Sequence, residues 1–290
     1  MEKKINKTEP PLFEVEGKAV LTGLKKGDSF GRYAILAVRD PLGFSKDAAD
    51  VIADYMTDVK EITRNSMFTV LSGYYKNAQI IVCSTGSGGA DTEIALMDLI
   101  QYAGVDTFLR IGTSGTQQPD LNVGDIVITE GAVRDEGLTK EYIAPQYPAI
   151  ANYEMMLSMI EVAQRKGLRY HVGITRSNDS IYCGQGRTVQ NYLPMPQDRI
   201  VEYWVNAGIL NVERETSTIL TLAQLFKARG GSVCVVCNSS ITQKVGVSQG
   251  IEDAISLGLE GLSLLAERDI QKEKAGQKWW TPYLNGNTKQ

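Results

Sequence analysis

The decisive stretch of this sequence is Thr107-Phe108-Leu109-Arg110-Ile111-Gly112-Thr113-Ser114-Gly115. Its apolar first half predicts a buried strand, and its glycine-flanked second half predicts a turn after that strand. Arg110 can offer a two-pronged donor to a phosphate, while the hydroxyls of Thr113 and Ser114 and the backbone N–H groups of the turn can donate to phosphate or ribose oxygens. Taken alone, the stretch also fits an ordinary strand end with a salt-bridged surface arginine.

Short apolar runs alternate with longer helical patterns along the chain. Unbroken apolar runs are typical of strands that helices cover on both faces. The expected strands are residues 33–38, 79–83, 107–111, 125–129 and 232–237, and the expected helices are residues 92–102, 153–166, 218–229 and 250–267. The predicted fold class is therefore α/β with a mainly parallel or mixed central sheet, formed by one domain of 290 residues.

Glycines and aromatic residues predict how several segments end. Asn152 before the helix 153–166 and Gly167 after it match usual start and stop signals, and Gly230 is expected to end the helix 218–229. The ends of the chain are expected to form an N-terminal arm of about residues 1–30 and a C-terminal tail of about residues 272–290. Three tail aromatics predict that the tail docks on the body of the protein: Trp279, Trp280 and Tyr283.

Composition narrows the classes of partner. The net charge is −4 and the isoelectric point is near 5.3, so the chain lacks the basic surface that binds a nucleic acid polymer. No apolar run approaches the ~20 residues of a membrane-spanning helix, and the N-terminus lacks the apolar core of a secretory signal. We therefore expect a cytoplasmic protein without a membrane partner, still compatible with a small anionic ligand.

Cysteine and histidine usage argues against a metal centre. Cys234 and Cys237 form a C-x-x-C pair, but they lie inside a buried-strand pattern in which cysteine acts as a small hydrophobe. His171 is the single histidine and opens an apolar segment. Histidine-rich zinc sites and Ser/His/Asp catalysis thus have little support, and no metal site is predicted.

Three polar segments follow predicted strands, where ligands bind in open α/β sheets. The first, residues 84–89, reads Ser-Thr-Gly-Ser-Gly-Gly but lacks the lysine of a P-loop and the spacing of a dinucleotide site. It fits direct ligand contact or simply a close approach of the backbone to a neighbouring segment.

In the second polar segment, Gln185 and Arg187 lie two residues apart in an expected extended loop, so both side chains can point to one side. Together they match the carbonyl and N–H edge of uracil, with a polar surface loop as the alternative.

The third polar segment places two carboxylates on either side of an arginine. Glu213, Arg214 and Glu215 lie at a predicted strand-to-helix junction. Carboxylates accept hydrogen bonds from vicinal hydroxyls, so the pair could grip a ribose. A helix start with solvated acidic charges would produce the same pattern.

Together these motifs resemble the nucleoside phosphorylase-I family, and within it the uridine phosphorylases. The resemblance covers roughly residues 33–230 in collinear order and rests on three motifs: residues 107–115, Tyr182-Cys183-Gly184-Gln185-Gly186-Arg187, and Asn211-Val212-Glu213-Arg214-Glu215. The Gln-x-Arg element favours a pyrimidine base, because purine-directed members use other residues there.

The resemblance implies a three-layer α/β/α sandwich whose central sheet is mixed, twisted and partly closed. It also implies a dimer, or a hexamer built as a trimer of dimers, with sites completed by a neighbouring subunit. The implied reaction is reversible phosphorolysis of uridine to uracil and ribose 1-phosphate, with phosphate as co-substrate and no metal or organic cofactor. Catalysis then depends on holding phosphate beneath an oxocarbenium-like ribose and on stabilising the departing base.

Residue roles follow from the same resemblance. Arg110 and Thr113 would hold phosphate, with Arg39 adding positive charge. The implied ribose contacts are Thr113, Glu213, Arg214 and Glu215. The implied base contacts are Gly115, Ile181, Gln185 and Arg187, where Ile181 replaces a usual phenylalanine. Arg110, Gln185 and Arg187 would be the catalytic residues, because they act on the nucleophile and the leaving group.

The chain departs from the family pattern at the phosphate and the ribose. The family usually has Gly-Asp-Pro-x-Arg after its first strand, whereas residues 39–43 read Arg-Asp-Pro-Leu-Gly. Ser66 aligns without gaps with an arginine that a neighbouring subunit supplies, and a small gap would restore Arg64. Arg214 replaces a methionine that packs on the ribose, and the N-terminal ribose-contacting histidine has no counterpart.

These departures leave alternatives to phosphorolysis open. Arg39 and Arg214 could reconstitute the lost charge, so that phosphate still binds. Otherwise the protein could be a pyrimidine nucleosidase, act on a nucleotide whose own phosphate meets Arg214, or be a catalytically silent nucleoside-binding protein.

Overall fold

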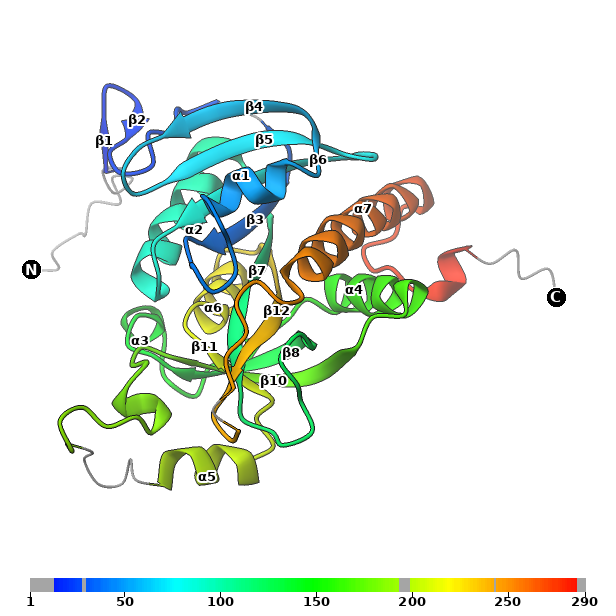
Figure 1. Ribbon diagram of the computed structural model, residues 1–290. Helices are drawn as coiled ribbons and strands as arrows, with labels where there is room; N and C mark the ends of the chain where they lie inside the picture. The colour runs from blue at the N-terminus through cyan, green and yellow to red at the C-terminus, as the bar shows by residue number, and fades with distance from the viewer. Residues whose placement is uncertain (1–12, 28–29, 193–198, 243, 286–290) are drawn as a thin grey trace, which may run out of the picture.

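The computed structural model describes residues 13–27, 30–192, 199–242 and 244–285 (Figure 1). Its centre is a ten-stranded mixed sheet with the order β11-β10-β8-β12-β7-β3-β6-β5-β4, and β9 pairs with β8. The strands of this sheet are β3 Tyr33–Val38, β4 Thr57–Arg64, β5 Thr69–Tyr75, β6 Ala78–Thr85, β7 Thr107–Thr116, β8 Ile126–Asp135, β9 Ala149–Ile150, β10 Tyr170–Asn178, β11 Asn211–Glu213 and β12 Arg229–Ser239. A separate small hairpin pairs β1 (Glu14–Val15) with β2 (Lys18–Ala19).

Helices cover both faces of the sheet. They are α1 Ala48–Ala53, α2 Gly89–Ala103, α3 Thr139–Tyr142, α4 Tyr153–Lys166, α5 Ile200–Asn206, α6 Thr216–Leu225 and α7 Ile251–Ala275. Short 3₁₀ turns span Cys183–Gln185 and Pro282–Asn285. In the described part of the chain, no helix is both long and apolar enough to cross a membrane.

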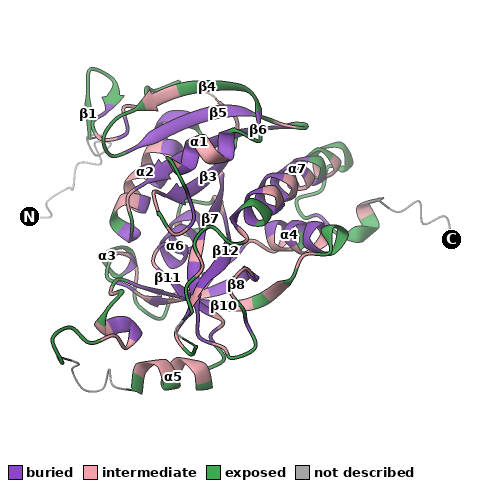
Figure 2. Ribbon diagram, viewed as in Figure 1, coloured by how far each residue is buried: buried purple, intermediate pink, exposed green. Residues whose placement is uncertain are grey.

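The alternation of side chains along β3 shows why the architecture has three layers. Ile35 packs in one apolar cluster with α1, α4 and α7, whereas its neighbour Leu36 packs in another with α2 and α6. Successive strand residues point to opposite faces, so both faces of β3 need a helical cover. Figure 2 shows the central strands buried between these helices. The predicted α/β/α sandwich with a mixed sheet is confirmed.

One part of the sheet closes into a ring. β11 pairs in parallel with β10 and also pairs antiparallel with the end of β7, with Val212 opposite Gly115. The ring therefore runs β7, β12, β8, β10 and β11. This closure matches the partly closed sheet that the resemblance implies, and it brings β7 and β11 together although about a hundred residues separate them in sequence.

Two local predictions are wrong. Residues 112–115 are not a turn, because β7 continues to Thr116 and its second half pairs with both β12 and β11. The helix predicted at 218–229 spans Thr216–Leu225 instead. It ends before Lys227, which adopts a left-handed backbone conformation, so Gly230 lies within β12 and is not a helix stop.

Other local predictions are confirmed. The strand 33–38 and the helix 153–166 match β3 and α4 residue for residue, and α7 extends the predicted helix to Ala275. The Asn152 side chain accepts a hydrogen bond from the Met155 N–H, and Gly167 ends α4 in the left-handed conformation. His171 lies near the start of β10, and Cys234 and Cys237 are buried in β12.

The C-terminal tail docks through one of its three aromatics. Trp280 is only 6% exposed, whereas Trp279 and Tyr283 are 58% and 81% exposed. Residues 1–12 of the expected N-terminal arm and 286–290 of the tail lie outside the described residues.

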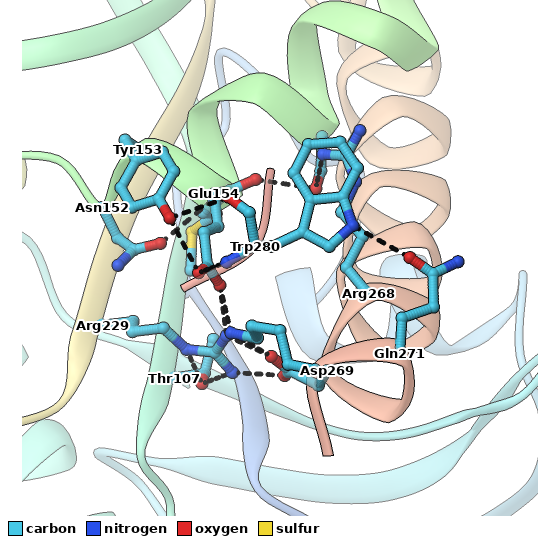
Figure 3. A network of polar contacts seen from close by, with 12 residues as sticks. Thr107, Asn152, Tyr153, Glu154, Arg229, Arg268, Asp269, Gln271 and Trp280 are labelled. Atoms are coloured by element: carbon cyan, nitrogen blue, oxygen red, sulfur yellow. Dashed lines mark hydrogen bonds and ion pairs between the residues drawn. The ribbon is translucent and has the colours of Figure 1, made fainter. Parts of the chain in front are cut away.

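A buried polar network receives Trp280 (Figure 3). Its backbone N–H donates to Glu154 at 2.9 Å, and the Arg268 guanidinium lies over its ring at 3.9 Å. In the same network Arg229, at the start of β12, donates to both carboxylate oxygens of Asp269 at 2.9 and 2.7 Å. The network thus joins α4, α7, β12 and the tail.

The buried Asp269 carboxylate is expected to make part of the free energy of unfolding depend on pH in the acid range. Burial opposes its charged form, but hydrogen bonds and charge from Arg229, with help from Lys272 and Tyr33, hold its pKa at about 2. This folded-state pKa lies below the usual carboxyl value. The contribution of ionised Asp269 to the free energy of unfolding is therefore present above about pH 4 and is lost as the pH falls toward 2.

We predict that Asp269→Asn lowers the free energy of unfolding by about 3 kcal/mol at pH 7, because Arg229 loses the nearer of its two buried carboxylate partners and keeps only Glu154, at 3.6 Å. Urea unfolding should show a smaller loss at pH 3. The control Asp54→Asn removes an exposed pair with Lys46 and should change stability by less than about 1 kcal/mol. A loss of equal size at both pH values would contradict this assignment.

Candidate active site

A cavity of about 280 Å³ opens near the carboxyl ends of the parallel strands β3, β7 and β12. All ten residues assigned from the sequence line it: Arg39, Arg110, Thr113, Gly115, Ile181, Gln185, Arg187, Glu213, Arg214 and Glu215. They come from segments far apart in the chain. The tertiary structure therefore brings together every side chain that the motifs had singled out.

Arg110 is held at the base of the cavity by two carboxylates. From β7 its Nε donates to Glu213 at 2.7 Å and its Nη2 to Glu215 at 2.5 Å, and all three side chains are at most 4% exposed. The third nitrogen, Nη1, is buried without a hydrogen-bond partner. A Cβ atom on Gly112 would lie 1.8 Å from Nη1, so glycine is required beside this guanidinium. One charged donor thus remains unused in the cavity.

The carboxylates of Glu213 and Glu215 differ in how many further hydrogen bonds their oxygens can accept. One Glu213 oxygen accepts from the Ser177 hydroxyl, and the other accepts from Arg110 and from the backbone N–H groups of Glu215 and Thr216 at 2.8 Å. Glu215 accepts from Arg110 and, at 2.6 Å, from the Gly88 N–H. Glu213 is therefore fully engaged in positioning Arg110, while Glu215 retains acceptor capacity.

Burial and neighbouring charges shift the pKa values of the two carboxyl groups in opposite directions. Burial alone raises the pKa of Glu213, but the positive charge of Arg110 and the hydrogen bonds from Ser177 and Arg110 bring that pKa below its ordinary value. Burial also raises the pKa of Glu215, and despite Arg110 the negative charge of Glu213 helps to keep it raised. Glu215 is thus the member of the pair that takes up a proton more readily.

Thr113 is fixed by the segment after β3. Its hydroxyl donates to the Asp40 carboxylate, whose other oxygen accepts from the Leu42 N–H at 2.9 Å. A Cβ atom on Gly43 would lie 2.7 Å from the Thr113 methyl group. The close packing of Gly43 on Thr113 gives a physical reason for glycine where the family pattern has arginine.

Arg39 lines the cavity, and each of its three nitrogens already makes a hydrogen bond within the protein. Its Nε donates to Asp47 at 2.8 Å, Nη2 to the Thr69 hydroxyl at 3.0 Å, and Nη1 to the Met67 carbonyl. Arg64, at the end of β4, also pairs within the chain, donating to Asp50 at 2.7 Å. Arg39 therefore supplies positive charge to the cavity wall, while its orientation is set by partners within the protein.

Arg214 differs from the other arginines of this region. Its Nη1 donates to the Ser87 hydroxyl at 2.9 Å, and its Nε is buried without a partner. Among the described residues, no carboxylate lies within 4.0 Å of its guanidinium. The glycine-rich segment 84–89 therefore contributes to the cavity wall through Ser87 and anchors Glu215 through Gly88.

Gln185 and Arg187 meet, but not in an extended loop as predicted. Gln185 ends a 3₁₀ turn, and Gly186 follows in the left-handed conformation. Arg187 Nη1 donates at 2.6 Å to both the Gln185 carboxamide oxygen and the Ile181 carbonyl. The turn still brings the two side chains to the same side, because Gly186 reverses the backbone between them.

Other residues that line the cavity include three polar ones that were not assigned from the sequence: Asp40, Ser87 and Asn238. Asn238 lies one residue before the end of β12 and directly follows the predicted strand 232–237, so the rule that ligands bind beyond strand ends could have found it. A Cβ atom on Gly115 would lie 2.9 Å from its carboxamide oxygen, so glycine lets this amide approach β7. Among the described residues, no group of three or more His, Cys, Asp or Glu side chains could hold a metal ion.

A family comparison agrees with this geometry. The profile described as "Phosphorylase superfamily" matches residues 38–255, which include every side chain assigned to the cavity. The chain belongs to this superfamily. The resemblance drawn from the three motifs is therefore confirmed, and the cavity is the candidate active site of a superfamily member.

Relatives within the superfamily carry two kinds of name. A uridine phosphorylase of Thermococcus kodakarensis is 38% identical over 99% of this chain and 100% of its own length. A uridine phosphorylase of Escherichia coli is 34% identical over 77% of this chain and 87% of its own. A guanosine phosphorylase of Halorubrum lacusprofundi is 33% identical over 64% of this chain and 72% of its own.

The buried triad of Arg110, Glu213 and Glu215 predicts a strong stability effect. Arg110→Met leaves two buried carboxylates without a cation, so we expect the free energy of unfolding at pH 7 to fall by about 3–5 kcal/mol. The loss should shrink as the pH falls, because the orphaned carboxyl groups take up protons.

The matched control adds Glu213→Gln and Glu215→Gln to Arg110→Met. Urea unfolding of this triple variant should recover most of the lost stability, because no unpaired charge remains buried. If the single and triple variants were equally unstable at pH 7, the loss would come from packing and not from charge.

Proposed function

We propose that this protein is a pentosyltransferase that cleaves uridine with orthophosphate to uracil and ribose 1-phosphate, reversibly. The observation that carries the proposal is the convergence of Arg110, Glu215 and the Gln185–Arg187 pair in one cavity. Relatives named uridine phosphorylase, one of them aligned over nearly the whole chain, support the same reaction.

We propose that phosphate binds beside Arg110 and Thr113. The unpartnered Nη1 of Arg110 is the charged donor, and the Thr113 hydroxyl lies on the same wall. Arg39 adds positive charge from the edge of the pocket. Phosphate held in this way stands ready to capture the ribose as the glycosidic bond breaks, so that the entropy cost of bringing the reactants together is met on binding.

We propose that the ribose lies against Glu215 and Arg214, and the base against Gly115 and Ile181. The remaining acceptor capacity of Glu215 suits ribose hydroxyls, whereas Glu213 serves by holding Arg110. At the base, Gln185 can donate and accept, and the positive charge of Arg187 stabilises the anion that forms on the departing uracil.

We further propose the setting in which this reaction takes place. As the family resemblance implies, the reaction uses phosphate as co-substrate and no metal or organic cofactor. The working unit is a homodimer or homohexamer in the cytoplasm, as the family resemblance implies, and neither a membrane nor a nucleic acid polymer takes part.

A second candidate function is supported by Arg214. Among the described residues its guanidinium has no carboxylate within 4.0 Å, although Glu215 interacts with it electrostatically, and it lines the cavity on the side proposed for the ribose. A cation without a direct carboxylate contact at this place suits a substrate whose ribose carries its own phosphate. We therefore keep a nucleotide-directed variant of the same bond cleavage as the alternative.

The reaction itself is tested with uridine in the presence and absence of phosphate. We predict that chromatography detects uracil only with phosphate, together with an equal amount of ribose 1-phosphate. Guanosine should react at least about tenfold more slowly, because Gln185 and Arg187 match a pyrimidine edge. Uracil release without phosphate would instead indicate a nucleosidase. Binding of uridine by calorimetry without turnover would indicate a silent binding protein.

Arg214 is tested by Arg214→Met with uridine and each uridine monophosphate as substrates. If Arg214 binds a substrate phosphate, the loss of this charge-assisted contact should lower kcat/KM for the nucleotide by about 10- to 150-fold and shift preference toward uridine. Lys140→Met, on the exposed face of α3, is the charge-matched control. An unchanged substrate profile would exclude the nucleotide-directed alternative.

A further inference from the structure

Arg176 is one of the most deeply buried charged side chains outside the candidate active site, and the proposed chemistry does not use it. It lies on β10, is 1% exposed, and ranks first by volume among the fully buried side chains. Its strand neighbours in register are Val133 and Val212, so it extends from an apolar stretch of the sheet. Burying a guanidinium is costly unless its donors are satisfied, so its partners indicate what it does.

The partners of Arg176 all lie around one turn. Its Nε and Nη2 donate to the same Asp135 oxygen at 2.7 and 2.5 Å, and its Nη1 donates to the Gly184 carbonyl at 2.7 Å. The face of its guanidinium lies 4.8 Å from the ring of Trp204 on α5. A single side chain therefore joins β8, β10, α5 and the 3₁₀ turn Cys183–Gln185.

Asp135 holds the same turn by a second route. Its carboxylate and its backbone carbonyl both accept from the Asn178 side-chain N–H₂ at 3.1 Å, and Asn178 in turn accepts from the Ser180 N–H. A Cβ atom on Gly184 would lie 2.0 Å from the Asn178 oxygen. The backbone at Gly184 is thus clamped between Asn178 and Arg176.

This clamp lies next to the base-reading pair. Gln185 follows Gly184 directly, and Arg187 donates to the Gln185 side chain. On the other side, Gly186 lies close to α5, where an added Cβ would be 3.0 Å from Val201. Because Trp204 on the same helix lies on Arg176, movement of Arg176 would release the turn from both sides.

We propose that Arg176 is a positioning residue for base recognition: by holding the Gly184 carbonyl and stacking on Trp204, it sets the orientation of Gln185 and Arg187. Arg176 is not among the residues that line the cavity. The proposal rests on uridine phosphorolysis as the activity. It means that Arg176, which lies behind the residues that line the cavity, helps to determine the affinity for the base. Lysine cannot replace it, because one ammonium group cannot serve Asp135 and Gly184 while stacking on an indole.

The kinetic test compares Arg176→Met and Arg176→Lys with the wild type. We expect KM for uridine to rise by about 10- to 100-fold in both variants, since small misplacements of positioning groups have effects of this size. KM for phosphate should stay within about twofold, because Arg110 and Thr113 lie on other elements. A merely structural role would raise both constants together or lower only the amount of active enzyme.

Arg169→Met is the matched control for the kinetic test. Arg169 also pairs with an aspartate, Asp125, at 2.8 Å, but its side chain is 61% exposed and it lies before β10 at the opposite end of that strand. This variant should leave both KM values unchanged. If it raised KM for uridine as much as Arg176→Met does, the effect would not be specific to the clamp and the proposal would be wrong.

Hydrogen exchange gives a test that needs no activity. In the protein without substrate, the amides of residues 183–187 should exchange at least about tenfold faster in Arg176→Met than in the wild type, while those of β7 stay unchanged. Should Arg176→Met fail to fold, Trp204→Leu, which removes only the stacking partner, should give the same local effect.

The two measurements separate failure of this proposal from failure of the proposed function. If the wild type releases no uracil from uridine, the proposed function is wrong. The hydrogen-exchange measurement still tests whether Arg176 holds residues 183–187 in place. Unchanged exchange at residues 183–187, or a KM for uridine equal to that of the wild type, overturns the role of Arg176.

Discussion

The buried ion triad of Arg110, Glu213 and Glu215 is the interaction on which the site depends. Neither carboxylate could remain charged at this depth without the guanidinium, and the guanidinium could not be buried without them. The triad also joins β7 to the β11–α6 junction, which closes the ring of strands. One set of charges therefore serves both the closure of the sheet and the placement of a donor in the cavity.

The other arginines of the cavity also differ in whether a carboxylate pairs with them. Arg39 is committed to Asp47, and Arg110 to two glutamates, so these arginines shape the walls as much as they attract an anion. Arg187 has only carbonyl acceptors, and Arg214 contacts a hydroxyl. Among the described residues, the two cavity arginines without a carboxylate within 4.0 Å thus lie on the sides that we propose for the base and the ribose.

Polar networks outside the cavity hold its parts in place. At the 3₁₀ turn Cys183–Gln185, Arg176 links Asp135, Gly184 and the ring of Trp204. At the opposite end of β12, Arg229 and Asp269 join the start of that strand to α7 and lie beside the docked tail. In both places a buried arginine with several acceptors joins elements that are distant in sequence, as large α/β folds require where apolar packing alone leaves the geometry loose.

The sequence by itself determined the layered α/β fold, five of the ten strands of the central sheet and ten of the residues that line the cavity, because apolar runs and polar motifs are local patterns. The tertiary structure decided what those patterns could not encode. Residues 112–115 are strand and not turn because β11 pairs with them from about a hundred residues away. Likewise, the three nitrogens of Arg39 hydrogen-bond to Asp47, Thr69 and Met67, and Arg176 lies over the ring of Trp204. In each case the deciding partner is distant in the chain, so only folding brings the two together.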